Sequence, residues 1–165
     1  MALPNKVLPG FSAAMYAQPA TNPTVLTLAQ LSLVANVAPL AVSGNLMNIE
    51  AVPAFGQDDA VASFSVAGSR QSDKIPAQSA PTSMTITAAW NPSDAVINTL
   101  LRTDAYSGVV DRTFVVSATE GSNIVYYSFI GRVSQFTIDN APGAEAKCTF
   151  TIHPRGNLYG WCNNA

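Results

Sequence analysis

The sequence predicts a mainly β protein, a β-sandwich or half-barrel with one flanking α-helix and extended arms at both ends. In the second half of the chain, apolar and polar residues alternate in runs separated by turn residues, as in half-buried strands. Clear helical spacing occurs in one segment, at about 93–104. The ends, 1–20 and 154–165, follow neither period. We therefore expect a single domain with its β body at 21–153 between two arms.

The first half of the chain gives the weaker signals. Residues 1–20 contain prolines at positions 4, 9 and 19 and suggest an extended N-terminal arm. Three later segments, 31–37, 46–52 and 60–67, have strand-like composition or alternation. Residues 68–81 are polar with two prolines, which predicts a long loop of the kind that usually has a function or an interface.

The middle of the chain predicts a strand followed by the helix. Residues 82–90 alternate so that Met84, Ile86 and Ala88 share one face of a strand. Asn91-Pro92-Ser93-Asp94 is a helix start signal, with Ser93 or Asp94 as the cap. The apolar stripe of the helix consists of Val96, Ile97, Leu100 and Leu101.

The second half is predicted to be nearly all strand. Residues 111–120 and 124–133 flank a Gly-containing turn and predict a hairpin. The second of these strands continues through 134–139 after a kink near Gly131. After a turn at Asn140–Gly143, residues 144–153 alternate most cleanly, so that one face is buried and one is wet. The wet side consists of Lys147, Thr149, Thr151 and His153.

The composition favours a protein that assembles. Apolar residues make up 48% of the chain and charged residues only 11%, where about 25% charged is usual for soluble domains. So few charges suggest that much of the surface is covered in the working state. The alternative is a compact monomer with a Ser/Thr/Asn surface. The net charge is −2 and the basic residues are scattered singly, so no cluster for tight nucleic-acid binding exists.

Residues for catalysis are scarce. His153 is the single histidine, which rules out a site built on two histidines, and we interpret it as a solvated strand residue. Asp58 and Asp59 form the one adjacent carboxylate pair, in an expected turn that lacks the further oxygen ligands of a calcium loop. Phosphate-binding and dinucleotide motifs are absent. We therefore expect no enzyme, no cofactor and no metal site.

Compartment signals are sparse as well. Cys148 and Cys162 do not make a disulfide framework and are expected to be free thiols in a reducing compartment. The start of the chain has no uninterrupted apolar targeting segment. Residues 25–42 are rich in apolar residues, but polar residues and a proline interrupt them, so we expect core or interface and no membrane span.

The chain from about Thr82 to Trp161 resembles the major tail (tail tube) proteins of long-tailed bacteriophages. The likeness lies in the strand ending at Trp90, the Asn-Pro-Ser-Asp helix with Leu100-Leu101, and the runs RTFVVSATE, YYSFIGRVSQFTIDN and CTFTIHPRGNLYGW. It covers roughly half of the chain and rests on element order and hydrophobic spacing. The resemblance implies a structural virion protein whose hexameric rings stack into a tube that conducts DNA from capsid to host cell.

The resemblance also implies partners and contact residues. Arms and a long loop would join neighbouring subunits and rings, with tape measure and tail terminator proteins as further partners and DNA passing through the lumen without specific binding. Such a protein would be made in the host cytoplasm and reside in the virion tail. The expected contact residues are Phe11, Tyr16, Arg70, Asp73, Lys74, Tyr159 and Trp161. For each of them ordinary packing within its own subunit is the alternative, and for Trp161 the two interpretations weigh equally.

Two other functions stay open. A tube subunit of a contractile injection or type VI secretion machine would share the fold and the ring. A secreted β-sandwich binding module would belong to another class, against which the missing targeting segment counts.

Overall fold

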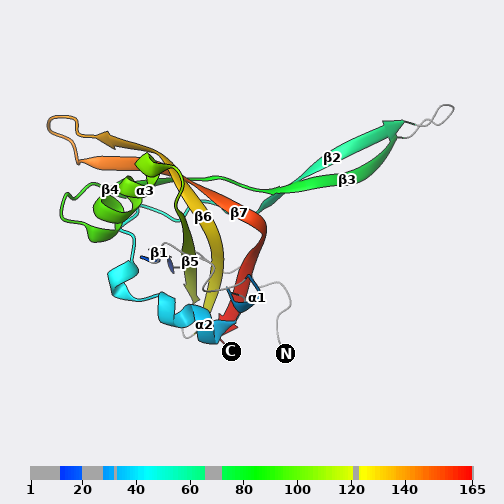
Figure 1. The fold of residues 1–165 in the computed structure, drawn as a ribbon, viewed down its shortest axis with the longest axis horizontal. Coiled ribbons are helices and arrows are strands. Elements are labelled where there is room, and N and C mark those ends of the chain that lie inside the picture. The colour runs from blue at the N-terminus through cyan, green and yellow to red at the C-terminus, as the bar shows by residue number, and fades with distance from the viewer. Residues whose placement is uncertain (1–11, 20–27, 32, 66–71, 121–122, 165) are drawn as a thin grey trace.

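A computed structural model shows a body built around a five-stranded antiparallel sheet, from which a long two-stranded hairpin projects (Figure 1). It describes residues 12–19, 28–31, 33–65, 72–120 and 123–164. The strand order in the sheet is β1-β5-β6-β7-β4. These strands are β1 (Ser12–Ala17), β4 (Met84–Ala89), β5 (Asp111–Glu120), β6 (Asn123–Asp139) and β7 (Lys147–Asn164). The prediction of a mainly β fold with a flanking helix is confirmed.

The two longest strands, β6 and β7, bend and so give the sheet its curvature (Figure 1). Their register shifts between Ser128 and Ile130 and again between Ser134 and Thr137. Such bulges increase the local twist of a strand and let it turn. Gln135 lies in the second bulge with a left-handed φ of 55°, a conformation uncommon outside glycine. The expected kink near Gly131 thus occurs as two bulges on either side of it.

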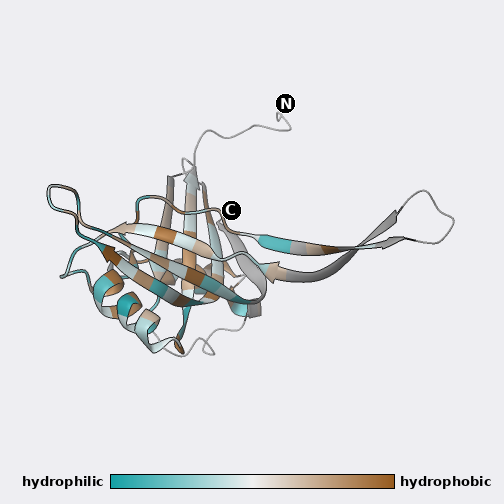
Figure 2. Ribbon diagram, turned by 90° about the horizontal axis from the view of Figure 1, so that it is seen from above, coloured by the Kyte–Doolittle hydropathy of each residue, from teal (hydrophilic) through white to brown (hydrophobic). Residues whose placement is uncertain are grey.

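The main core lies on the side of the sheet that is covered by the helical residues 95–107. Each strand contributes alternate residues to it, and Phe114, Phe129 and Phe150 are the largest fully buried side chains. Phe114 stacks on Phe129 with ring centroids 5.6 Å apart. When the ribbon is coloured by hydropathy, apolar and polar residues alternate along these strands (Figure 2). This alternation is why the sequence predicted β4, β5, β6 and the first part of β7 close to their observed bounds.

The helical layer over this core is a π-helix, η4 (Ala95–Leu101), continued by α3 (Arg102–Ser107). The carboxylate of Asp94 caps its start by accepting the N–H groups of Val96 and Ile97, each at 2.9 Å. Gly108 ends α3 in the left-handed conformation, with φ of 65°. The predicted helix and its Asp94 cap are therefore confirmed, and the helix extends to Ser107 instead of about residue 104.

A second, smaller cluster lies on the opposite side of the sheet, under α1 (Leu28–Leu31), α2 (Val34–Val37) and the 3-10 turn η2 (Ala38–Leu40). The strand predicted over 31–37 was wrong, because Leu31 ends α1 and Val34–Val37 form α2. Leu31, Val34 and Val37 also fit a helical spacing, and this is the face that packs against Val115 and Tyr126.

The segment after the 3-10 turn η3 (Ser43–Asn45) is another correction. The strand predicted over 46–52 is not formed; single bridges join Leu46 to Tyr16 of β1 and Ile49 to Ala88 of β4. Because β1 and β4 are the two edges of the sheet, one short segment contacts both edges. It shields part of each edge without closing a barrel.

The hairpin consists of β2 (Gln57–Ser65) and β3 (Ser72–Pro81). The loop predicted over 68–81 was therefore wrong from residue 72 onward. Each strand of a two-stranded ribbon has one edge without a partner strand. Proline is tolerated in β3 where its missing N–H would face that unpaired edge. Asp58 and Asp59 were expected in a turn but lie in β2, paired with Ala80 and Ser79 of β3. The register shifts at a bulge between Asp59 and Val61.

The chain ends also differ from expectation. Residues 12–17 of the predicted N-terminal arm form β1, which pairs with β5 in register from Ser12–Thr119 to Ala17–Phe114. The predicted C-terminal arm over 154–165 is largely strand, because β7 continues to Asn164 and pairs again with β6 beyond a four-residue interruption. Residues 156–159 have no partners in β6. The alternation of apolar and polar residues is lost there, and for this reason the sequence did not predict the last part of the strand.

Candidate assembly surfaces

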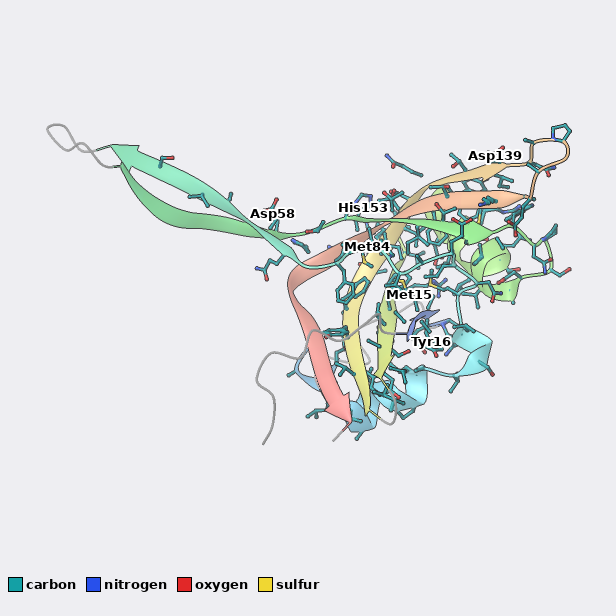
Figure 3. The ribbon with its side chains drawn as sticks, turned by 180° about the vertical axis from the view of Figure 1, so that it is seen from behind. Met15, Tyr16, Asp58, Met84, Asp139 and His153 are labelled. Carbon is teal, nitrogen blue, oxygen red and sulfur yellow. The ribbon has the colours of Figure 1, made fainter. Side chains whose placement is uncertain are left out.

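The hairpin is the most prominent surface of the molecule because it extends away from the body (Figures 1 and 3). Asp58 lies at the base of the hairpin, where it joins the body, and the two strands continue outward from there (Figure 3). All side chains of β2 that the structure describes are exposed, and Val61 has 57% of its surface accessible. An isolated two-stranded ribbon is at best marginally stable in water. The ribbon therefore has the character of a segment that is completed by a partner.

Two of the three predicted contact residues of the loop, Asp73 and Lys74, fall in this ribbon. The backbones of Asp73 and Lys74 lie in β3, opposite Phe64 and Ser63. Their side chains, and Arg70 altogether, lie outside the described residues. The segment predicted to bridge subunits thus belongs to the projecting hairpin, and contact of these three residues with a neighbour stays a prediction.

The predicted aromatic anchors are placed differently. Tyr16 is half-buried in β1 and packs against the cluster under α1 and α2 within its own chain. The backbones of Tyr159 and Trp161 lie in β7, with Trp161 opposite Tyr127, and their side chains lie outside the described residues. Phe11 also lies outside them. Tyr16 thus packs within its own chain, and contact of any of the four aromatic residues with a neighbouring subunit stays a prediction.

An apolar hollow of about 510 Å³ opens beside the segment that precedes the hairpin. Phe55 of this segment meets Tyr127 of β6 edge-on, with ring centroids 5.1 Å apart. The hollow is lined by Ala13, Val52, Pro53, Ala54, Phe55, Val116, Ala118, Val125 and Tyr127. Sequence reasoning missed this surface because 52–55 has no strand or helix period, and an apolar Val-Pro-Ala-Phe run was its only signal.

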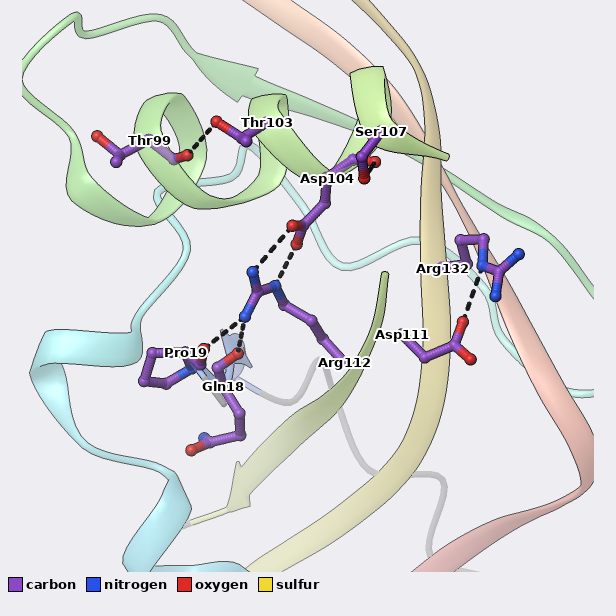
Figure 4. Close-up of polar contacts among 9 residues, drawn as sticks. All are labelled: Gln18, Pro19, Thr99, Thr103, Asp104, Ser107, Asp111, Arg112 and Arg132. Carbon is purple, nitrogen blue, oxygen red and sulfur yellow. Dashed lines mark hydrogen bonds and ion pairs between the residues drawn. The ribbon is translucent and has the colours of Figure 1, made fainter. Parts of the chain in front are cut away.

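A buried ion pair fixes the helical layer to the sheet (Figure 4). Arg112 of β5 donates to Asp104 of α3 through both Nε and Nη2, the latter at 2.8 Å from Oδ1. Its Nη1 donates to the backbone carbonyls of Gln18 and Pro19, just after β1. Three parts of the chain thus meet at one guanidinium, whose donors match carboxylate and carbonyl acceptors.

Asp111 forms a second, more exposed charge cluster, with Arg132 and Arg155. Arg132 Nε lies 2.8 Å from Oδ1 of Asp111, and Arg155 donates to the other oxygen. Partial burial alone would raise the pKa of Asp111, but the hydrogen bonds and positive charges of the two arginines outweigh it and lower the pKa. The cluster joins β5, β6 and β7.

His153 is exposed on β7, as expected, but two hydroxyl groups flank its ring. Ser83 Oγ lies 2.9 Å from Nδ1 and Ser134 Oγ lies 2.7 Å from Nε2. In the described part of the chain, the ring nitrogens contact these two hydroxyl groups and no carboxylate, and the apolar hollow lies elsewhere. Within the described ranges, no three metal-ligating side chains gather at one place. The imidazole of β7 thus lies between Ser134 of β6 and Ser83, the residue just before β4.

Two further properties bear on function. Cys148 is buried, and this burial, with a smaller effect of the Asp94 charge, raises the pKa of its thiol to about 11. Such a thiol is not a reactive nucleophile near neutral pH. No helix in the described part of the chain has the length and apolar character that a bilayer crossing requires.

No protein-family model and no curated protein matches the sequence. Solved structures do match across nearly the whole chain. A chain of the sheath/tube terminator of an extracellular contractile injection system, PVC, aligns with a TM-score of 0.64 and 10% identity over 98% of this chain and 99% of its own. A chain of the six-fold symmetrised baseplate of the anti-feeding prophage aligns with a TM-score of 0.60 and 9% identity, over 94% and 95%.

The SPP1 tail tube also matches, with a TM-score of 0.55 and 12% identity over 90% of this chain and 76% of the SPP1 chain. At such identities the likeness concerns the fold and not the individual side chains. The chain therefore has the fold found in components of tail tubes and of contractile injection systems.

Proposed function

We propose that this protein is the structural subunit of a phage tail tube. Six copies close a ring, rings stack, and the resulting tube conducts DNA from the capsid to the host cell. The observation that carries this proposal is the fold, which matches tube, terminator and baseplate chains over 90–98% of the length of this chain. The six-fold symmetrised baseplate supports the choice of a hexameric ring.

The hairpin supports the same proposal. Its described β2 side chains are exposed, and the ribbon projects far beyond the body (Figure 1). A subunit that remained alone would keep two unprotected strand edges there, and such edges invite pairing with other chains. Docking on a neighbouring subunit or ring would cover them. The low charge of the chain, 11% of its residues, fits a surface that is largely covered after assembly.

The proposal assigns the protein a mechanical role, without catalysis or cofactor. It would be made in the host cytoplasm and reside in the virion tail, with tape measure and tail terminator proteins as partners. A net charge of −2 with scattered basic residues fits a conduit, because clustered cations would hold the DNA phosphates.

The tube of a contractile injection machine is the second candidate. The terminator and baseplate chains align with higher TM-scores than the SPP1 tail tube, 0.64 and 0.60 against 0.55. These machines share the ring geometry, so the cargo and the presence of an outer sheath distinguish the two candidates.

Cryo-electron microscopy of the purified protein, and of particles from the producing cells, tests the proposal. We expect stacked six-membered rings with a central channel, attached to a DNA-filled capsid in the particle. A sheathed particle without a capsid would favour the injection machine. A stable monomer under all conditions, absent from any particle, would contradict both and favour a binding module.

A further inference from the structure

One face of the sheet carries two rows of hydroxyl groups that run across three strands. Thr85 of β4 pairs with Thr151 of β7, which pairs with Ser134 of β6. In the next row, Thr87 pairs with Thr149, which pairs with Thr137. Directly opposed residues of an antiparallel pair project on the same face. We call these six residues the hydroxyl face: Thr85, Thr87, Ser134, Thr137, Thr149 and Thr151.

The reverse side of the same three strands is the main core, where Ile86, Val133 and Phe150 are buried. On the same side of the sheet, the first half of β6 and its neighbour β5 are apolar, since Tyr126, Ile130 and Val115 pack in the cluster under α1 and α2. These helices thus cover one half of this side. On the other half, Thr85 and Thr137 are exposed, Thr87, Ser134 and Thr149 are half-buried, and Thr151 is buried and donates to the side-chain oxygen of Gln135. The uncovered half is the one that carries the hydroxyl groups.

The charges that border the hydroxyl face are matched by opposite charges. At one end Lys147 binds Glu50 and lies opposite Asp139 in register. At the other end Arg132 and the more exposed Arg155 both bind Asp111, next to His153 and its two serine partners. The rows between them carry no ionisable side chain. The face therefore has neither an apolar patch for a protein partner nor a cluster of cations for a polyanion.

We propose that the hydroxyl face lines the channel of the tube, an inference that rests on the proposed function. A channel wall stays in water after assembly, as the outer surface of the tube does, so it has to be polar. The wall must also bind DNA only weakly, because each phosphate that a fixed cation neutralises increases the affinity for DNA. Neutral hydroxyl groups satisfy both conditions. Strands β4, β7 and the second half of β6 would then be the channel strands.

The test places a heavy-atom label on this face in assembled tubes. Thr85→Cys and Thr137→Cys are each made in a Cys162→Ser background, where the remaining Cys148 is buried. Tyr106→Cys in the same background is the matched control, because Tyr106 is 70% exposed on α3, which covers the opposite side of the sheet. Tubes are treated with a mercurial and imaged by cryo-electron microscopy, and unfolding midpoints of the unassembled variants are compared with the wild type.

We expect new density at the channel wall for Thr85→Cys and Thr137→Cys, and at a larger radius for Tyr106→Cys. Density from the two threonine positions on the outer surface or between subunits would overturn the inference while leaving the tube itself in place. Loss of tubes in both threonine variants, with unchanged unfolding midpoints, would also overturn it, since the face would then be a subunit contact. If the wild type forms no tube at all, the proposed function fails and this inference with it.

Discussion

Arg112 and Asp104 form a two-pronged ion pair in the interior, with side chains only 5% and 4% exposed. The pair joins β5 to α3, and the same guanidinium holds the carbonyls of Gln18 and Pro19. The Arg112 side chain therefore links the helical layer and the residues just after β1 to strand β5 (Figure 4).

Removing one partner of this pair should destabilise the protein strongly. Arg112→Met leaves the Asp104 carboxylate buried without its cation, a loss of about 3–5 kcal/mol in the free energy of unfolding. The double variant Arg112→Met/Asp104→Leu should lose less, because no unpaired charge remains. Urea denaturation measures both, with Arg155→Met as the exposed control, expected to cost less than about 1 kcal/mol. Equal losses in the single and double variants would contradict this reasoning.

Acid should weaken the Asp111 cluster. Because the folded-state pKa of Asp111 is lower than its ordinary value of 3.8, this group stabilises the fold above that value. The contribution is lost as the pH falls through the folded pKa. The difference in unfolding free energy between the wild type and Asp111→Asn should therefore be constant above about pH 5 and shrink progressively below about pH 4. A difference that stays constant down to pH 2 would show that the two arginines do not lower this pKa.

Gly131 should not tolerate a side chain. A Cβ there would lie 2.8 Å from Cγ2 of Ile152 and 3.3 Å from the ring of Phe114, both buried in the core. We expect Gly131→Ala to lower the unfolding free energy by about 1–3 kcal/mol through overpacking. Gly44→Ala is the matched control, since no atom lies within 4 Å of a Cβ at that position. Thermal or urea unfolding of the two variants gives the comparison, and equal stability would contradict the packing.

The thiol of Cys148 should report on unfolding. It is buried and its pKa is raised to about 11, so it forms little thiolate at pH 8. In Cys162→Ser, we expect a disulfide reagent to label Cys148 only as fast as the protein opens. Labelling should therefore accelerate with urea in parallel with the unfolded fraction. Fast labelling in native buffer would show that the strand β7 opens locally.

The hairpin should be needed for assembly and not for folding. Replacing residues 60–78 with Asn-Gly joins Asp59 directly to Ser79, its partner in the ribbon, through a two-residue turn. We expect the unfolding midpoint to stay within a few degrees of the wild type, because the ribbon projects away from the body. Tubes should be absent by electron microscopy. Tubes of wild-type length from the shortened chain would rule out the hairpin as a joint.

Local patterns predicted the second half of the chain well because each element there follows one period. In β4 buried residues alternate with exposed or half-buried ones, β5 is a continuous run buried on both faces, and Asp94 caps the helix through its own neighbouring N–H groups. The first half carried two periods at once. Leu31, Leu33 and Val37 suit a strand, but Leu31, Val34 and Val37 suit a helix, and contact with Val115 and Tyr126 selected the helix.

The candidate surfaces depended more on tertiary structure. Residues 72–81 contain two prolines and looked like a loop, but pairing with β2 makes them the second strand of a projecting ribbon. The hollow beside Phe55 brings together residues from 13 to 127, and the hydroxyl face requires the register of three strands. A local sequence pattern cannot show which residues so far apart in the chain come together.

The sequence by itself determined the strand class, the helix capped by Asp94 and the scarcity of charge, because each depends on neighbouring residues or on composition. Only the tertiary structure decided where the hairpin projects, which edges the segment around Ile49 shields and which sheet face stays uncovered. These features depend on contacts between residues far apart in the chain. Such contacts stabilise the fold only after chain entropy has been lost to bring the strands together, so no local sequence pattern encodes them.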